Sequence, residues 1–406
     1  MSRRLVPIVL LVLLVSLAAT AAPLRRKAQR GPTPPPSPAV PAAGQPLPNL
    51  TQAQRDAFAD GLADFASQEE VIDGLGPIFN ERSCATCHSA PVVGGGSARA
   101  VTRFGRRTNN IFDALANLGG SLVQDHAIGP ADGSSHTFRP EVVPATANVT
   151  TRRRTTPLFG LGLVDATPDA DFIALAAAQA ARRDGTAGRA PLVDNIRAGM
   201  KTVGKFGWKG QVPTLFQFAG DAYVNEMGIT TPDFPNESCP QGNCAELSFN
   251  PLPGLNDDGN GPILLTNYMT MLAAPPRGPQ NRDTTDGEAT FNQLGCNTCH
   301  VATQRSGASN IAALNRQTYH PYSDFLLHDM GALGDGIEQG AANAREMRTA
   351  PLWGLRFVQR YLHDGRATTV EQAILAHDGQ ARGARDRYAA LAATAKTKVL
   401  AFLNSL

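Results

Sequence analysis

Apolar residues recur at the three- and four-residue spacing of an amphipathic helix in three stretches of the chain. The first follows Thr51, whose hydroxyl can cap a helix, and carries Phe58, Leu62 and Phe65 on one face. The second, residues 168–182, is rich in alanine and begins at a proline, which suits a first helical turn. The third ends the chain, with apolar positions at Tyr388, Leu391, Ala395, Val399, Phe402 and Leu403. Alternating strand patterns are scarce and Gly/Pro loops are many, so the sequence predicts a mainly α fold with long loops.

The first 50 residues show a different pattern. Residues 1–22 combine two arginines, a short apolar run and a small-residue cleavage site, as a secretory signal peptide does. The run is too short to span a bilayer comfortably, so we expect cleavage and no stable membrane insertion, with an uncleaved anchor as the alternative. Residues 23–50 are rich in proline and predict a stiff or disordered tether, which places the start of ordered structure near Thr51.

Length and charge narrow the class of protein. A chain of 406 residues has room for two or three domains. Its formal net charge of +2 falls to zero when Arg3 and Arg4 leave with the signal. A near-neutral chain lacks the basic footprint of a nucleic-acid-binding protein, so no nucleic-acid partner is expected.

Two copies of Cys-x-x-Cys-His carry the chemistry of the chain. Two thiols at this spacing can form thioethers to one haem, and the histidine that follows can ligate its iron. A redox dithiol or half a zinc site is the alternative for one isolated copy, but here each pair has its own histidine. We therefore expect two covalently bound c-type haems, held by Cys84, Cys87 and His88 and by Cys296, Cys299 and His300. Because c-type haem is attached outside the cytoplasm, this assignment implies a periplasmic protein.

The remaining pair, Cys239 and Cys244, predicts a small disulfide loop, with a redox pair as the alternative.

The sequence around the motifs repeats as well. Each copy has Phe-Asn ahead of it, at Phe79-Asn80 and Phe291-Asn292. Residues 154–161 and 348–355 share an Arg-Thr-x-Pro-Leu-aromatic-Gly-Leu pattern, and residues 208–215 are echoed more faintly by 363–370. The proline and the later turn glycine are 53 residues apart in the first half and 14 in the second. We therefore predict two related domains, 51–280 and 281–406, the first enlarged by insertions.

The chain resembles the di-haem oxidoreductases, also labelled thiol oxidoreductases, within the bacterial di-haem cytochrome c peroxidase superfamily. The closer match is carried by the paired motifs and by Phe206-Gly-Trp-Lys, Asn225-Glu-Met-Gly-Ile-Thr, Leu327-His-Asp-Met-Gly and Tyr361-Leu-His-Asp-Gly-Arg. It covers about residues 51–406 and implies two cytochrome c-like haem domains. In that superfamily the C-terminal haem is a high-potential entry site for electrons, with His and Met ligands. Met347 stands four residues before Pro351, as the family's methionine does, and Met330 is the alternative.

The resemblance makes the first haem the site of reaction. Trp208 matches a tryptophan between the haems, and Gln217 and Glu226 match residues of the distal pocket. Glu226 would move a proton between the two oxygens of peroxide, a general acid–base role. The alternatives are a surface carboxylate at Glu226 and simple packing at Trp208. His126 and His136 are the positional candidates for a sixth ligand of this haem.

The expected function is therefore that of an enzyme like the di-haem cytochrome c peroxidases. It would reduce hydrogen peroxide with electrons from a small cytochrome or cupredoxin. Oxidation, maturation or oxygenation of another substrate on the same scaffold is one alternative, and a non-enzymatic electron-transfer cytochrome is another. The family often binds calcium between its domains, but the acidic turn at residues 257–260 lacks an EF-hand pattern and also suits a solvated loop.

Overall fold

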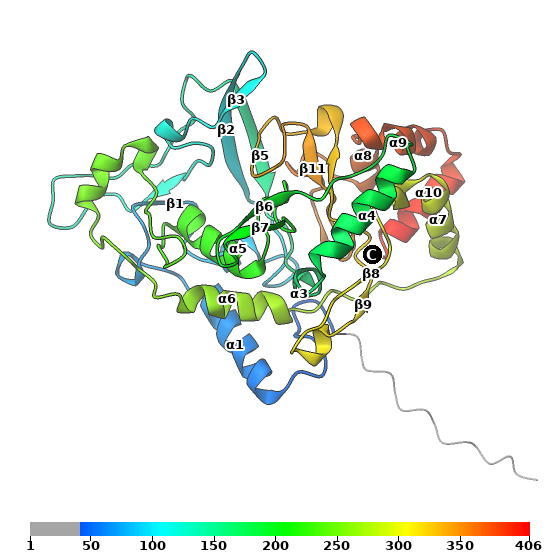
Figure 1. Cartoon of the computed structure of the whole chain (residues 1–406), viewed down its shortest axis with the longest axis horizontal. Helices are drawn as coiled ribbons and strands as arrows, with labels where there is room; N and C mark the ends of the chain where they lie inside the picture. The colour runs from blue at the N-terminus through cyan, green and yellow to red at the C-terminus, as the bar shows by residue number, and fades with distance from the viewer. Residues whose placement is uncertain (1–40) are drawn as a thin grey trace, which may run out of the picture. The chain divides into compact units, whose positions relative to one another are not determined.

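The computed structural model describes residues 41–406, which form one compact unit (Figure 1). The predicted signal peptide and most of the predicted tether lie outside the described residues. The α-helices are α1 (Gln52–Ala66), α2 (Cys84–Cys87), α3 (Leu161–Asp165), α4 (Asp169–Ala181), α5 (Leu215–Ala222), α6 (Asn260–Met271), α7 (Arg282–Gln293), α8 (Val370–Leu375), α9 (Arg382–Ala389) and α10 (Ala393–Leu403). None of these helices is long and apolar enough to cross a membrane.

The three predicted helices are present, with changed boundaries. The Thr51 hydroxyl accepts a hydrogen bond from the Gln54 amide and caps α1, as predicted. Pro168 precedes α4 as its N-cap residue rather than lying in its first turn. The predicted C-terminal helix is wrong as one element, because the backbone becomes extended at Ala392 and separates α9 from α10.

The residues just before α1 are also ordered. The Leu47 amide donates to Met271 O at 2.8 Å, and the Ala273 amide donates to Gln45 O at 3.0 Å. Leu50 is only 5% exposed and belongs to the core. The predicted start near Thr51 is therefore too late, because the end of the Pro-rich segment pairs with the chain that leaves α6.

Short antiparallel sheets lie among the long loops. The strands are β1 (Ile78–Phe79), β2 (Ala100–Thr108), β3 (Ile111–Asp113), β4 (His126–Ala127), β5 (Val149–Arg154), β6 (Leu192–Asn195), β7 (Met200–Val203), β8 (Gln304–Arg305), β9 (Thr318–Tyr319), β10 (Leu327–Asp329) and β11 (Glu346–Arg348). The largest sheet has the order β3-β2-β5, and the others are the pairs β1-β4, β6-β7, β8-β9 and β10-β11. Arginines and threonines fill much of β2 and β5, which is why their sequences do not show the apolar alternation of a half-buried strand.

Each Cys-x-x-Cys-His motif follows a helix that crosses a second helix closely. α1 packs against α6, and α7 packs against α10 (Figure 1). A glycine lies at each crossing: a Cβ atom would come within 2.2 Å of Leu264 O at Gly61 and within 2.0 Å of Lys398 O at Gly287. The two halves of the chain therefore share a helix crossing as well as a motif.

Candidate haem sites

The two motifs adopt similar short helical turns. Cys84–Cys87 form α2, and Cys296–Thr298 form a 3-10 turn. In each copy the histidine amide donates to the carbonyl of the first cysteine, at 3.0 Å for both His88 and His300. All four motif thiols are free, whereas Cys239 and Cys244 form the predicted disulfide.

Both motif histidines are oriented by a backbone carbonyl. His88 Nδ1 lies 3.1 Å from Gly95 O, and His300 Nδ1 lies 2.9 Å from Tyr322 O. Nδ1–H donates in this arrangement, so the lone pair of Nε2 stays available for a metal. Burial lowers the pKa of each imidazole to about 4, which keeps both rings neutral, as ligation of iron requires.

Three of the four motif thiols have a raised pKa. Burial raises the pKa of Cys84 and of Cys87 to about 12, and that of Cys296 to about 11. Redox and zinc-binding cysteines have a lowered pKa and act as thiolates. The raised pKa of these three thiols differs from the lowered pKa typical of a redox dithiol.

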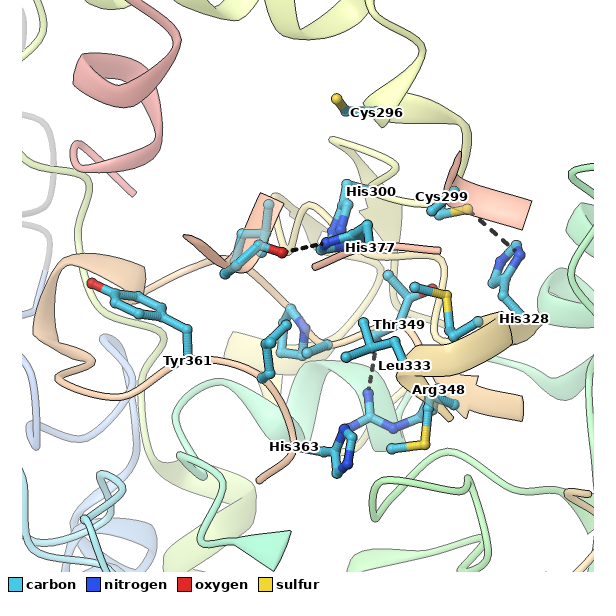
Figure 2. Close-up of a pocket in the computed structure, with 18 of the residues that line it drawn as sticks. Cys296, Cys299, His300, His328, Leu333, Arg348, Thr349, Tyr361, His363 and His377 are labelled. Atoms are coloured by element: carbon cyan, nitrogen blue, oxygen red, sulfur yellow. Dashed lines mark hydrogen bonds between the residues drawn. The ribbon is translucent and has the colours of Figure 1, made fainter. Parts of the chain in front are cut away.

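A cavity of about 630 Å³ lies beside the second motif. Figure 2 shows Cys296, Cys299 and His300 along one side of it, with Arg348 and His363 across from them. Both candidate methionines line this cavity. Met347 is buried on β11, and Met330 is half-buried just after β10. Both methionines thus line the cavity beside the second motif, and the structure does not choose between them.

Two arginines of the sequence repeat face the same cavity. Arg154 and Arg348 open the two Arg-Thr-x-Pro segments and both line the cavity wall. Arg348 is buried and Arg154 is half-buried, and burial lowers the pKa of each guanidinium to about 10. Among the described residues both donate to backbone carbonyls and neither pairs with a carboxylate. A buried cation is costly without an anion, and the propionates of haem are suitable anions. The cavity therefore fits haem by its thiols, its imidazole and its cations, and the repeat was the sequence signal for these arginines.

Trp208 connects the two repeated segments. Its indole Nε1–H donates to Arg154 O at 3.0 Å, and its own carbonyl accepts the Arg348 amide at 2.8 Å. The Arg154 guanidinium also lies 5.5 Å from the centre of the indole ring. The buried indole therefore lies on the cavity wall and is bonded to both repeated segments, while its place between two haems stays a prediction.

Glu226 lies beside the first motif, in a π-helical turn formed by Tyr223–Met227. Its Oε2 accepts a hydrogen bond from Asn80 Nδ2 at 2.8 Å, and its carbonyl accepts the Asn80 amide at 2.7 Å. Burial raises the pKa of Glu226, while Arg103 and the bond from Asn80 oppose that shift. The carboxylate is close enough to Cys87 to raise the pKa of its thiol. Glu226 is thus half-buried at the first motif, and π-helical turns recur at functional sites.

Gln217 makes different contacts. Its Nε2 donates to Asp194 O and its Oε1 accepts the Ile196 amide, each at 3.0 Å. These bonds tie α5 to the β6-β7 hairpin, and the structure does not bring this amide to Glu226. Its place in a distal pocket stays a prediction.

The two candidate histidines for a sixth ligand also have partners. His126 is exposed, pairs with Asp125 at 2.7 Å and stacks on Phe79. His136 stacks on Phe249 and lies 3.2 Å from Glu246, next to the disulfide loop. Only His126 shares the neighbourhood of Glu226, because the Asp125 amide donates to Asn80.

Two carboxylates of the acidic turn bind backbone amides at the start of α6, whose N-cap residue is Gly259. Asp257 accepts hydrogen bonds from the amides of Gly259 and Gly261, and Asp258 accepts one from the amide of Asn260, at the start of α6. These bonds give both carboxylates a structural use at a helix N-terminus.

Sequence reasoning missed a buried pair beside Cys299. His328 Nδ1 lies 3.5 Å from Cys299 Sγ, and its Nε2 lies 2.9 Å from Asp324 Oδ2. Gln179 also donates to Asp324 at 2.8 Å, so the pair is held from α4. The His-Asp dipeptide at 328–329 was the available signal, but the partner of His328 is Asp324.

The geometry shows two similar Cys-x-x-Cys-His turns, one beside a carboxylate and one beside a cavity lined by two methionines. The model of the family described as "Di-haem oxidoreductase, putative peroxidase" matches residues 134–406, about two thirds of the chain. The chain therefore belongs to the di-haem oxidoreductase family. The match includes the second motif and Glu226, and the first motif precedes it.

Comparison with curated proteins gives no match. Among solved structures, hydrazine synthase of Kuenenia stuttgartiensis is 13% identical, with 97% of this chain and 99% of that chain covered and a TM-score of 0.39. A MauG-like protein associated with microbial copper homeostasis is 12% identical, with 91% and 94% covered and a TM-score of 0.40. The diheme peroxidase BthA from Burkholderia thailandensis is 14% identical, with 90% and 87% covered and a TM-score of 0.41.

Proposed function

We propose that this chain is a periplasmic di-haem oxidoreductase that reduces hydrogen peroxide with electrons from a small cytochrome or cupredoxin. The observation that carries the proposal is an asymmetry between two otherwise equivalent motifs. His88 and His300 are oriented in the same way, but a half-buried carboxylate lies beside the first motif and methionine sulfur beside the second.

The residues for haem attachment follow from the motifs. Cys84 and Cys87 would hold one c-type haem with His88 as axial ligand, and Cys296 and Cys299 the other with His300 and Met347. When bound, the haems supply one-electron transfer and a metal site for peroxide. Thioether ligation favours ferrous iron, so the second site suits the entry of electrons.

Glu226 performs the proton transfer in this proposal. Its carboxylate takes a proton from one peroxide oxygen and returns it to the other, so that the departing oxygen leaves as water. Two electrons from the donor and two protons from solvent then balance the conversion of one peroxide to two waters. Trp208 lies between the repeated segments, where it can pass electrons from the second site toward the first.

Replacing Glu226 with glutamine tests the proposal. Glu226→Gln keeps the size of the side chain and removes its basicity, so peroxide turnover should fall by ~10²-fold or more. Glu237→Gln is the matched control, because burial also raises the pKa of Glu237, to about 7, and its partners are Ser238 and Asn250. An unchanged rate in Glu226→Gln would remove this residue from the mechanism.

The spin state of each haem in the half-reduced protein separates an enzyme from an electron carrier. The proposal requires one low-spin, six-coordinate iron and one iron that opens a coordination position. If both irons stay low-spin in every redox state and peroxide does not react, the protein is an electron-transfer cytochrome and the proposed function fails.

A further inference from the structure

An asparagine stands four residues before the first cysteine of each motif, but the two have different surroundings. Asn292, at the end of α7, is exposed, and its side chain has no hydrogen bond within the part of the chain that the structure describes. Asn80, at the equivalent place of the first motif, is only 1% exposed. The sequence repeat therefore does not explain why Asn80 is buried. The explanation lies in the residues that surround Asn80 in the fold.

The amide of Asn80 is fixed in one orientation. Its Oδ1 accepts the Asp125 amide at 3.2 Å, and its Nδ2 donates to Glu226 Oε2 at 2.8 Å. The backbone of Asn80 is held as well, because its N–H donates to Glu226 O at 2.7 Å and its carbonyl accepts from Arg99 at 2.8 Å. Since a backbone N–H can only donate, the oxygen of the amide faces Asp125 and the NH₂ faces the carboxylate.

The two carboxylate oxygens of Glu226 are not equivalent. Oε2 is bound by Asn80, whereas Oε1 has no hydrogen-bond partner among residues 41–406. The charges that face this carboxylate are Arg103 on β2, which favours its ionised form, and Asp221 and Asp125, which oppose ionisation. A carboxylate that relays a proton needs one oxygen fixed in position and the other free to reach the substrate.

We propose that Asn80 is the positioning residue of the Glu226 carboxylate. The amide holds Oε2, stabilises the ionised carboxylate and directs Oε1 toward the substrate, and it takes no proton itself because an amide is not a base at neutral pH. This role rests on the proposed function of Glu226.

The sharpest variant is Asn80→Asp, which keeps the shape of the side chain and replaces the donor with an acceptor. The loss of the donor and the added negative charge should raise the pKa of Glu226. The low-pH limb of kcat/KM for peroxide should then move to higher pH. At neutral pH the rate should fall by about 10- to 100-fold, the worth of a hydrogen bond to a charged group. Asn292→Asp is the matched control and should leave both the rate and the pH profile unchanged.

A double variant distinguishes positioning from general damage. In a Glu226→Gln background, Asn80→Asp should cause no further loss of peroxide turnover, because both changes remove the same interaction. If the two losses multiply while haem content and visible spectra match those of the single variants, Asn80 acts independently of Glu226 and the inference is overturned.

Infrared titration of the loaded protein supplies a readout that does not depend on turnover. The carboxyl band of Glu226 is identified by its disappearance in Glu226→Gln, and Asn80→Asp should shift its titration to higher pH. If the wild-type protein does not reduce peroxide but this shift occurs, the proposed function fails and the positioning role stands. If turnover depends on Glu226 but Asn80→Asp behaves like Asn292→Asp, the positioning role fails and the proposed function stands.

Discussion

The regions around His88 and His300 are alike in how they hold an imidazole and different in what they place near it. In both, a Cys-x-x-Cys turn follows a helix with a close glycine crossing, and a backbone carbonyl orients the imidazole. The first region then adds Asn80 and Glu226, while the second adds a cavity with methionine sulfur. The two regions therefore share the elements that position the motif histidine and differ in the side chains that lie near it.

The likeness extends to the loops after the motifs. Gly160 and Gly354, which end the Pro-Leu-aromatic-Gly segments, have φ angles of 72° and 73°. The later turns are closed by equivalent isolated bridges, Phe206 with Val212 and Tyr361 with Ala367. Glycine is needed at positions 160 and 354 because other residues adopt this left-handed conformation at a cost. The repeat is therefore one of backbone geometry as well as sequence.

We expect the largest effect from replacing Met347, the proposed methionine ligand of the second region. In Met347→Ala, the spectrum of a low-spin iron with His and Met ligands should be lost completely, and the reduction potential should fall because the thioether favours ferrous iron. Visible spectroscopy with a redox titration measures both. Met330→Ala is the control, and loss of the same spectrum in that variant would transfer the ligand role to Met330.

The next largest effect concerns the glycine helix crossing that the two regions share. Gly61→Ala and Gly287→Ala each drive a methyl group against a backbone carbonyl, so each should lower the free energy of unfolding by about 1–3 kcal/mol. The midpoint of urea unfolding measures the loss. Gly383→Ala in α9 is the control: only the flexible Arg387 side chain lies nearby, at 3.4 Å, and helix propensity should make the change neutral or slightly stabilising. A tolerated methyl at either crossing would show that the two regions are built differently.

Local patterns were predicted from the sequence, and contacts between distant segments were not. The motifs, the disulfide, the cap at Thr51 and the repeat depend on residues near each other along the chain. The bond between Asn80 and Glu226 spans 146 residues, and no spacing rule connects them. At the start of α8, the hydroxyl of Thr369 rather than that of Thr368 accepts the Gln372 amide. Neighbouring threonines offer the same cap, and packing decides between them.

The smallest effect concerns His363, the counterpart of Trp208 in the repeat. The two rings meet edge to face at 6.3 Å, and His363 is 3% exposed, with no hydrogen-bond partner for Nε2 among the described residues. Burial lowers the pKa of His363 to about 4 from an ordinary value of 6.5. Between these pH values the unfolded chain binds a proton that the folded protein does not, so this residue makes stability fall as the pH falls.

His363→Phe keeps an aromatic ring beside Trp208 and removes the proton site. Between pH 7 and pH 5 the unfolding free energy of the wild-type protein should fall, in part because of His363. In the variant this fall should be smaller by up to about 2 kcal/mol. Urea unfolding at the two pH values measures the difference, with the exposed His320→Gln as the control that should follow the wild type. If His363→Phe loses as much stability on acidification as the wild type, the buried ring at this position is not kept neutral. The second copy of the repeat would then have, at the position equivalent to Trp208, a histidine that can become charged in the folded protein.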